Sequence, residues 1–142
     1  MAIPDDPFWR EFIAATPART AKVASVAADG SPRVTPVWVV LDGDDLVFTT
    51  HQTSAKGKAI RRDPRVAMCF DDERPPFSYV IVLGQASVSD ELDELRRWAT
   101  VIGGRYMGEA RAEEYGTRNG VPGELLVRVR PSKVITARDL AD

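Results

Sequence analysis

The chain has 142 residues, of which 44% are hydrophobic and 28% charged, and its net charge at pH 7 is −2. This size and balance predict a single domain over residues 1–142 with one ordinary core. The slightly acidic total argues against general nucleic-acid binding. The longest apolar runs fall far short of the roughly 20 residues that span a bilayer, and no signal sequence begins the chain, so we expect a cytoplasmic protein without a membrane span.

Cysteine and histidine are scarce, with Cys69 and His51 the single residue of each type. A structural zinc site needs about four such ligands, so no metal site is expected. Cys69 lies in an apolar run and is expected to be a buried small hydrophobe. Hydrolase chemistry is disfavoured, because a Ser-His-Asp triad would have to use His51 and no serine sits in a nucleophile-elbow glycine pattern.

The N-terminal third predicts a helix followed by strands. Asp6 and Pro7 have the character of a helix cap and a first helical position, and this helix is expected to end near Thr16. Turn residues then separate three apolar segments, which predicts an antiparallel meander. Its strands are expected at residues 21–28, 33–41 and 46–50.

The remaining elements alternate between short helices and strands. Apolar residues between Leu92 and Ile102 recur at three- and four-residue steps, so they predict an amphipathic helix, which Gly103-Gly104 ends or bends. Further helices are expected at 54–62 and 109–115, and further strands at 66–70, 78–89 and 125–136. Six strands without βαβ alternation predict a mainly β, α+β fold, an antiparallel six-stranded split β-barrel with short flanking helices.

Positive charge is concentrated in one segment. Between residues 53 and 65 five basic residues stand against one acidic residue, a local net charge of +4 in a chain whose total is −2: Lys56, Lys58, Arg61, Arg62 and Arg65 against Asp63. Lys56 and Lys58 fall in the first turns of the expected helix, where the helix dipole disfavours cations.

An anion bound at this helix start would explain the two lysines. Helix N–H groups, the hydroxyls of Thr50, Thr53 and Ser54, and the charge of Lys56 could bind a phosphate. A solvated basic helix with Ser54 as an ordinary N-cap fits the same pattern. Both interpretations remain open from the residues alone.

The sequence resembles the pyridoxamine 5'-phosphate oxidase-like split barrels, which bind flavin or deazaflavin cofactors. The resemblance covers about residues 10–136 and is carried by GSPRVTPVW at 30–38, FTT at 48–50, SAK at 54–56, RRDPRV at 61–66 and SYV at 78–80 with Gly84. Ala55 stands where the flavin oxidases usually carry arginine. The chain is therefore most similar to the actinobacterial branch that uses the deazaflavin coenzyme F420.

The resemblance implies a homodimer with two cofactor sites at the subunit interface. In each site Lys56 would hold the phosphate, Pro36-Val37-Trp38 would lie along the ring system, and Phe77 would contact the ring from the partner subunit. Lys58 and Arg61 would extend a basic surface toward the polyglutamate tail. The predicted cofactor-binding residues are Pro36, Val37, Trp38, Thr49, Thr50, Ser54, Ala55, Lys56, Lys58, Arg61, Phe77 and Tyr79.

Adjacent helical residues point about 100° apart, so only one of Arg61 and Arg62 is expected to face the ligand. The function implied is an F420-dependent oxidoreductase that transfers a hydride from reduced deazaflavin to a small unsaturated organic substrate. The alternatives are a riboflavin phosphate (FMN) oxidase or reductase of the same fold, and a carrier protein that binds F420 or haem without catalysis.

Overall fold

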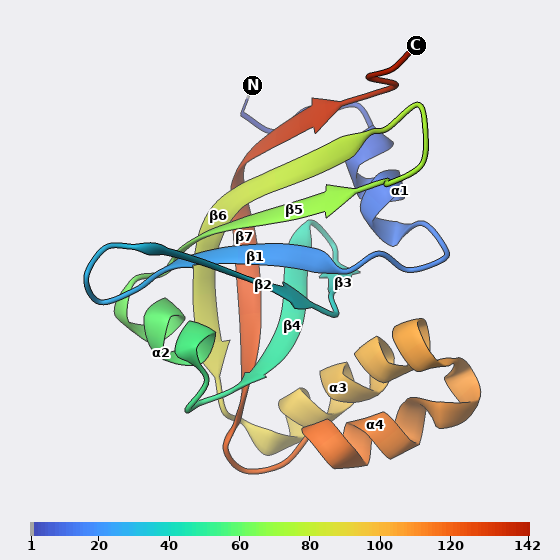
Figure 1. Ribbon diagram of the computed structural model, residues 1–142. Coiled ribbons are helices and arrows are strands. Elements are labelled where there is room, and N and C mark those ends of the chain that lie inside the picture. The colour runs from blue at the N-terminus through green and yellow to red at the C-terminus, as the bar shows by residue number, and fades with distance from the viewer. Residues whose placement is uncertain (1) are drawn as a thin grey trace.

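The computed structural model describes residues 2–142 and forms one antiparallel seven-stranded sheet with short helices around it (Figure 1). In chain order the elements are α1 (Phe8–Ala14), β1 (Ala21–Val26), β2 (Pro32–Val37), β3 (Val40–Asp42), β4 (Asp45–His51), α2 (Ala55–Arg62), β5 (Arg65–Asp71), β6 (Tyr79–Ser89), α3 (Leu92–Met107), the 3-10 helix η1 (Glu109–Arg111), α4 (Ala112–Asn119) and β7 (Glu124–Ala137). The expected mainly β, α+β fold is confirmed. None of the helices in residues 2–142 has the length and apolar character to cross a membrane.

The strand expected at 33–41 is broken at Trp38 and Val39, so the sheet has seven strands rather than six. Its first part, β2, pairs with β1, and its second part, β3, pairs with β4. Both pairings of the expected meander are therefore present, but they are made by the two halves of a broken strand, which the order β2-β1-β5-β6-β7-β4-β3 places at opposite edges of the sheet.

The break at Trp38 and Val39 also explains how the sheet closes. These two residues alone connect the two edge strands, so the sheet must curl until its edges meet. Curling of this kind turns an open sheet into a barrel. Figure 1 shows β2 crossing in front of the other strands toward β3. The junction between β2 and β3 is therefore the point at which the barrel is split.

Alternate residues of the strands fill the barrel. Val23, Met68 and Val82 are at most 1% exposed, and Trp9 of α1 is fully buried among them. Intervening residues face outward, as the period of two in a strand requires. Cys69 is one of these and is half-buried, rather than buried as expected.

Helix α3 continues through Gly103 and Gly104 to Met107, so the expected break there is wrong. The two glycines are needed for packing instead. A Cβ at Gly103 would collide with the Tyr115 side chain of α4, and one at Gly104 would lie 2.6 Å from a Glu109 carboxylate oxygen. Helices α3 and α4 consequently lie side by side against the end of the barrel where β4 and β7 meet (Figure 1).

Candidate cofactor site

A cavity of about 310 Å³ lies where the β2–β3 junction, the end of β4, the start of α2, the α3–α4 pair and the start of β7 come together. Six of the predicted cofactor-binding residues line it: Pro36, Val37, Trp38, Thr49, Thr50 and Lys56. The remaining lining residues are His51, Ala99, Ile102, Asn119 and Glu124. The barrel closure thus brings the predicted residues of segments 36–38 and 49–56 together with residues of α3, α4 and β7.

A chain of hydrogen bonds fixes the lysine at one wall. Ser54 Oγ accepts from the Gly57 N–H at 3.0 Å and donates to the His51 carbonyl at 2.7 Å. Its single proton is therefore used, so Thr50 Oγ1, 2.8 Å away, must be the donor in the contact between the two hydroxyls. Lys56 Nζ donates to Thr50 Oγ1 at 3.4 Å. Within residues 2–142 this is the only hydrogen bond of the ammonium, which leaves two of its three N–H donors for a ligand.

Ser54 is accordingly an N-cap that positions Thr50, and it does not line the cavity. Thr53 is also engaged elsewhere. Its N–H donates to His51 Nδ1 at 3.1 Å, and its hydroxyl lies 2.8 Å from the same nitrogen. The hydroxyls of Ser54 and Thr53, which were expected to bind a phosphate, instead form hydrogen bonds within the turn that precedes Lys56.

The electrostatic environment of the cavity combines one cation with one acid. Burial lowers the pKa of Lys56, and the neighbouring Glu124 carboxylate opposes that change. Burial raises the pKa of Glu124, against the influence of His51 and Lys56. Both groups are half-buried in the cavity wall, so each is sensitive to the charge of whatever binds there.

The opposite wall is aromatic. The Trp38 ring stacks on Tyr106 of α3 with centroids 5.3 Å apart and an interplanar angle of 3°, and it meets Tyr115 edge-on at 5.6 Å. Tyr106 Oη donates to the Arg19 carbonyl at 2.6 Å and accepts from the Val39 N–H at 3.2 Å. The two helices therefore fix both the indole and the backbone crossover beside it.

Other predicted residues lie outside this cavity. Ala55, Lys58 and Arg61 are exposed on α2. Arg62 donates to the Val26 carbonyl at 3.4 Å, whereas Arg61 makes no hydrogen bond or ion pair with residues 2–142. Of the two arginines, Arg61 is therefore the one without a polar partner among residues 2–142.

Phe77 and Tyr79 lie at the opposite end of the barrel. The loop between β5 and β6 that carries Phe77 is beside α1, away from α3 and α4 (Figure 1). Phe77 has a φ of 60°, which is unusual for a bulky residue. Its backbone is held by the Arg74 carbonyl and the Leu140 N–H, each at 2.9 Å, while its side chain stays 41% exposed. Neither aromatic residue can reach the cavity of its own chain.

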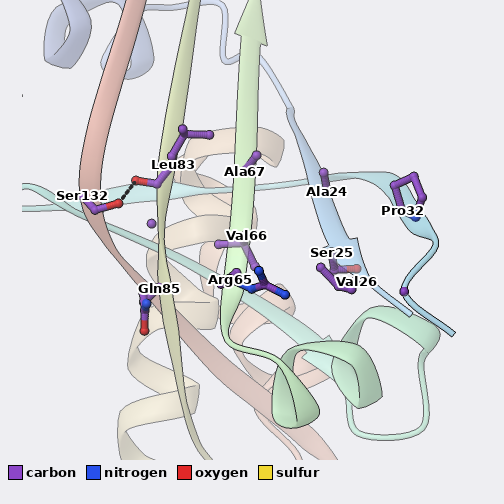
Figure 2. Close-up of a pocket in the computed structure, with 12 residues that line it drawn as sticks. Ala24, Ser25, Val26, Pro32, Arg65, Val66, Ala67, Leu83, Gln85 and Ser132 are labelled. Carbon is purple, nitrogen blue, oxygen red and sulfur yellow. Dashed lines mark hydrogen bonds between the residues drawn. The ribbon is translucent and has the colours of Figure 1, made fainter. Parts of the chain in front are cut away.

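The outward face of β1, β5 and β6 is apolar and hollowed. Two cross-strand rows form it: Ala24–Ala67–Leu83 and Lys22–Cys69–Ile81. A hollow of about 640 Å³ lies over the first row, and one of about 380 Å³ over the second, where Tyr79 also lies. Figure 2 shows Ala24, Ala67 and Leu83 on three adjacent strands beneath the larger hollow. We call this surface the outer sheet face.

The sequence model of the family described as pyridoxamine 5'-phosphate oxidase matches residues 6–137. The chain belongs to this family. Membership of this family supports an oxidoreductase of the kind that uses a flavin-type cofactor.

Solved structures share the fold of this family member. The conserved hypothetical protein Rv2991 from Mycobacterium tuberculosis superposes with a TM-score of 0.82 at 22% identity, covering 99% of this chain and 90% of that one. An F420 reductase gives 0.72 at 22% identity, covering 94% and 98%. The haem storage protein HutZ from Vibrio cholerae gives 0.71 at 18% identity, covering 92% of each chain. No curated protein matches the chain.

Proposed function

We propose that this protein is a deazaflavin-dependent reductase that uses reduced coenzyme F420 to reduce a small unsaturated organic substrate. The observation that carries the proposal is the gathering of Trp38, Thr50 and Lys56 around one cavity of a pyridoxamine 5'-phosphate oxidase barrel. Ala55, beside Lys56, supports the deazaflavin over FMN, and the F420 reductase among the structural neighbours has the same fold.

The residues of the cavity suit such a cofactor by their chemistry. When bound, the reduced deazaflavin supplies the hydride, while the protein contributes position and electrostatics. The two remaining N–H donors of Lys56 would hold a phosphate oxygen, with Thr49 and Thr50 beside it. The fixed indole of Trp38 offers a flat apolar wall to the ring system. Ala99 and Ile102 of α3 would exclude water from that side.

A second copy of the chain is part of this proposal. The cavity, at about 310 Å³, lies at the lower limit of the roughly 300–1,000 Å³ found for small-molecule sites. A tricyclic ring with a ribityl phosphate therefore needs further walls. The outer sheet face is the apolar surface available for a partner, and a partner could bring the exposed Phe77 ring to the open side of the cavity.

Side-by-side titration tests the choice of cofactor. We expect purified protein to bind coenzyme F420 more tightly than FMN. The fluorescence of each ligand, measured under identical conditions, gives the two dissociation constants. The physical reason is that Lys58 and Arg61 continue the basic surface of α2 beyond the phosphate site. Copurification of FMN at full occupancy without measurable F420 binding would instead establish the flavin alternative.

Replacing Phe77 with alanine tests the contribution of the partner. We expect about a tenfold loss of cofactor affinity, because an aromatic ring stacked on the cofactor contributes about 0.5–1.5 kcal/mol beyond its buried area. The melting temperature should barely change, since Phe77 is exposed. Phe8→Ala is the matched control, because Phe8 packs on Phe12 and away from the cavity. Unchanged affinity in Phe77→Ala would remove this residue from the site.

A further inference from the structure

Glu124 is the acidic residue of the cavity, and the proposed function leaves it unexplained. It is the first residue of β7 and pairs with His51 at the end of β4. This register places its carboxylate in the same cavity as Lys56. A carboxylate is an unexpected neighbour for a phosphate, because like charges at close range repel each other.

The charges around the cavity can be counted element by element. The lining contains three titratable groups: His51 on β4, Lys56 on α2 and Glu124 on β7. The β2–β3 junction contributes no charge, and neither do Ala99 and Ile102 of α3 or Asn119 of α4. The negative charge of Glu124 cancels the positive charge of Lys56. Together these two groups therefore offer directed N–H donors but no net positive charge.

Such a wall responds to the charge of the phosphate. A phosphate monoester carries about −1.5 to −2 at pH 7 because its second pKa is about 6. A phosphodiester lacks that second ionisation and carries a single negative charge. Since Coulomb energy is proportional to charge, Glu124 repels the monoester up to about twice as strongly as the diester.

We propose that Glu124 determines cofactor specificity by making the cavity favour a phosphodiester monoanion over a phosphomonoester dianion. The inference deepens the proposed function and rests on it, because coenzyme F420 carries a phosphodiester and FMN a monoester. Lys56 holds either phosphate, and Glu124 selects between them. Its distance from Lys56 suits this role: the two side chains influence each other's pKa but form no ion pair within 4 Å.

Three probes with the same ring isolate the phosphate: FMN, its monomethyl phosphodiester, and riboflavin, which has no phosphate. Glu124→Gln keeps the shape of the side chain and removes its charge. We expect this variant to bind FMN about tenfold and the methyl ester about threefold more tightly, since the gain in binding energy scales with ligand charge. Riboflavin affinity should stay unchanged. Glu124→Asp keeps the charge and should retain the wild-type preference.

The same probes give a second readout through pH. In the wild type the preference for the methyl ester over FMN should shrink as the pH falls from 8 to about 5.5, where FMN becomes mainly a monoanion. Burial raises the pKa of Glu124, so its own protonation acts in the same direction. In Glu124→Gln the change with pH should be smaller. Thermal melting confirms that each variant is folded.

The outcomes that overturn the proposal are distinct. If Glu124→Gln tightens the binding of FMN and of its methyl ester equally, Glu124 does not discriminate between ligands by their phosphate charge. Weaker binding of all three probes would make it a hydrogen-bond acceptor for the ring or ribityl chain. Titration with coenzyme F420 in the same series distinguishes failure of this inference from failure of the proposed function. If F420 binds but Glu124→Gln leaves the ratio of the FMN and methyl-ester dissociation constants unchanged, only the role of Glu124 is refuted. If F420 does not bind, the proposed function is refuted.

Discussion

Replacing Ala67 with glutamate is expected to split the proposed dimer and to weaken cofactor binding more than a hundredfold. Ala67 lies in the middle of the outer sheet face, between Ala24 and Leu83, and is half-buried in the single chain. An unpaired carboxylate buried at an interface costs about 3 kcal/mol or more, which is over a hundredfold in a dissociation constant. In a twofold interface the substitution occurs on both partners, so its effect is doubled.

Ala110→Glu is the matched control, because Ala110 is exposed on η1, far from the outer sheet face. Light scattering should give a dimer for the wild type and this control, and a monomer for Ala67→Glu. The wild type and Ala110→Glu should melt at similar temperatures. Ala67→Glu should still unfold cooperatively, because its glutamate is accessible to water in a monomer, but at a somewhat lower temperature because it lacks the stabilisation that dimerisation gives. An Ala67→Glu protein that stays dimeric would show that the partner binds another surface. A monomeric one with full cofactor affinity would show that one chain completes the site alone.

The fold could be predicted from the sequence wherever a local pattern of residues determines the secondary structure. Apolar segments bounded by turn residues located β1, β5, β6 and β7, and the N-cap Ser54 located the start of α2. The break between β2 and β3 could not be predicted in this way, because residues 33–41 are uniformly compatible with a strand. Pairing with β1 on one side and β4 on the other interrupts the strand at Trp38 and Val39, and only tertiary structure determines that pairing.

The residues of the candidate site could likewise be predicted only where a local sequence pattern pointed to them. The sequence predicted Lys56 because a lysine in the first turn of a helix conflicts with the helix dipole. Glu124 gave no such signal, because its place in the cavity depends on the register between β4 and β7. Tyr106 was equally hidden, since it appears in the sequence only as one more position of a helix. Residues that act through pairing or packing become visible only when the distant segments have been placed.

Replacing Lys56 with alanine is expected to weaken binding of phosphorylated cofactors about ten- to a hundredfold. A hydrogen bond to a charged group contributes about 1.5–3 kcal/mol, which corresponds to that range. Riboflavin, which lacks the phosphate, should lose little affinity. Folding should survive, because the described contacts of the ammonium amount to one long hydrogen bond to Thr50. Fluorescence titration with FMN, coenzyme F420 and riboflavin measures the three affinities, and thermal melting checks the fold.

Two further variants decide what the loss means. Arg10→Ala removes a positive charge that is bound to Asp44 at the other end of β4, so its cofactor affinity should be that of the wild type. In Lys56→Ala the Glu124 carboxylate is left without its counter-charge, so adding Glu124→Gln should tighten FMN by more than the about tenfold expected when Lys56 is present. Equal losses for riboflavin and FMN would place Lys56 beside the ring or ribityl chain. If Glu124→Gln tightens FMN equally with and without Lys56, the two side chains act independently, and the cancelled charge of the cavity would no longer explain its choice of ligand.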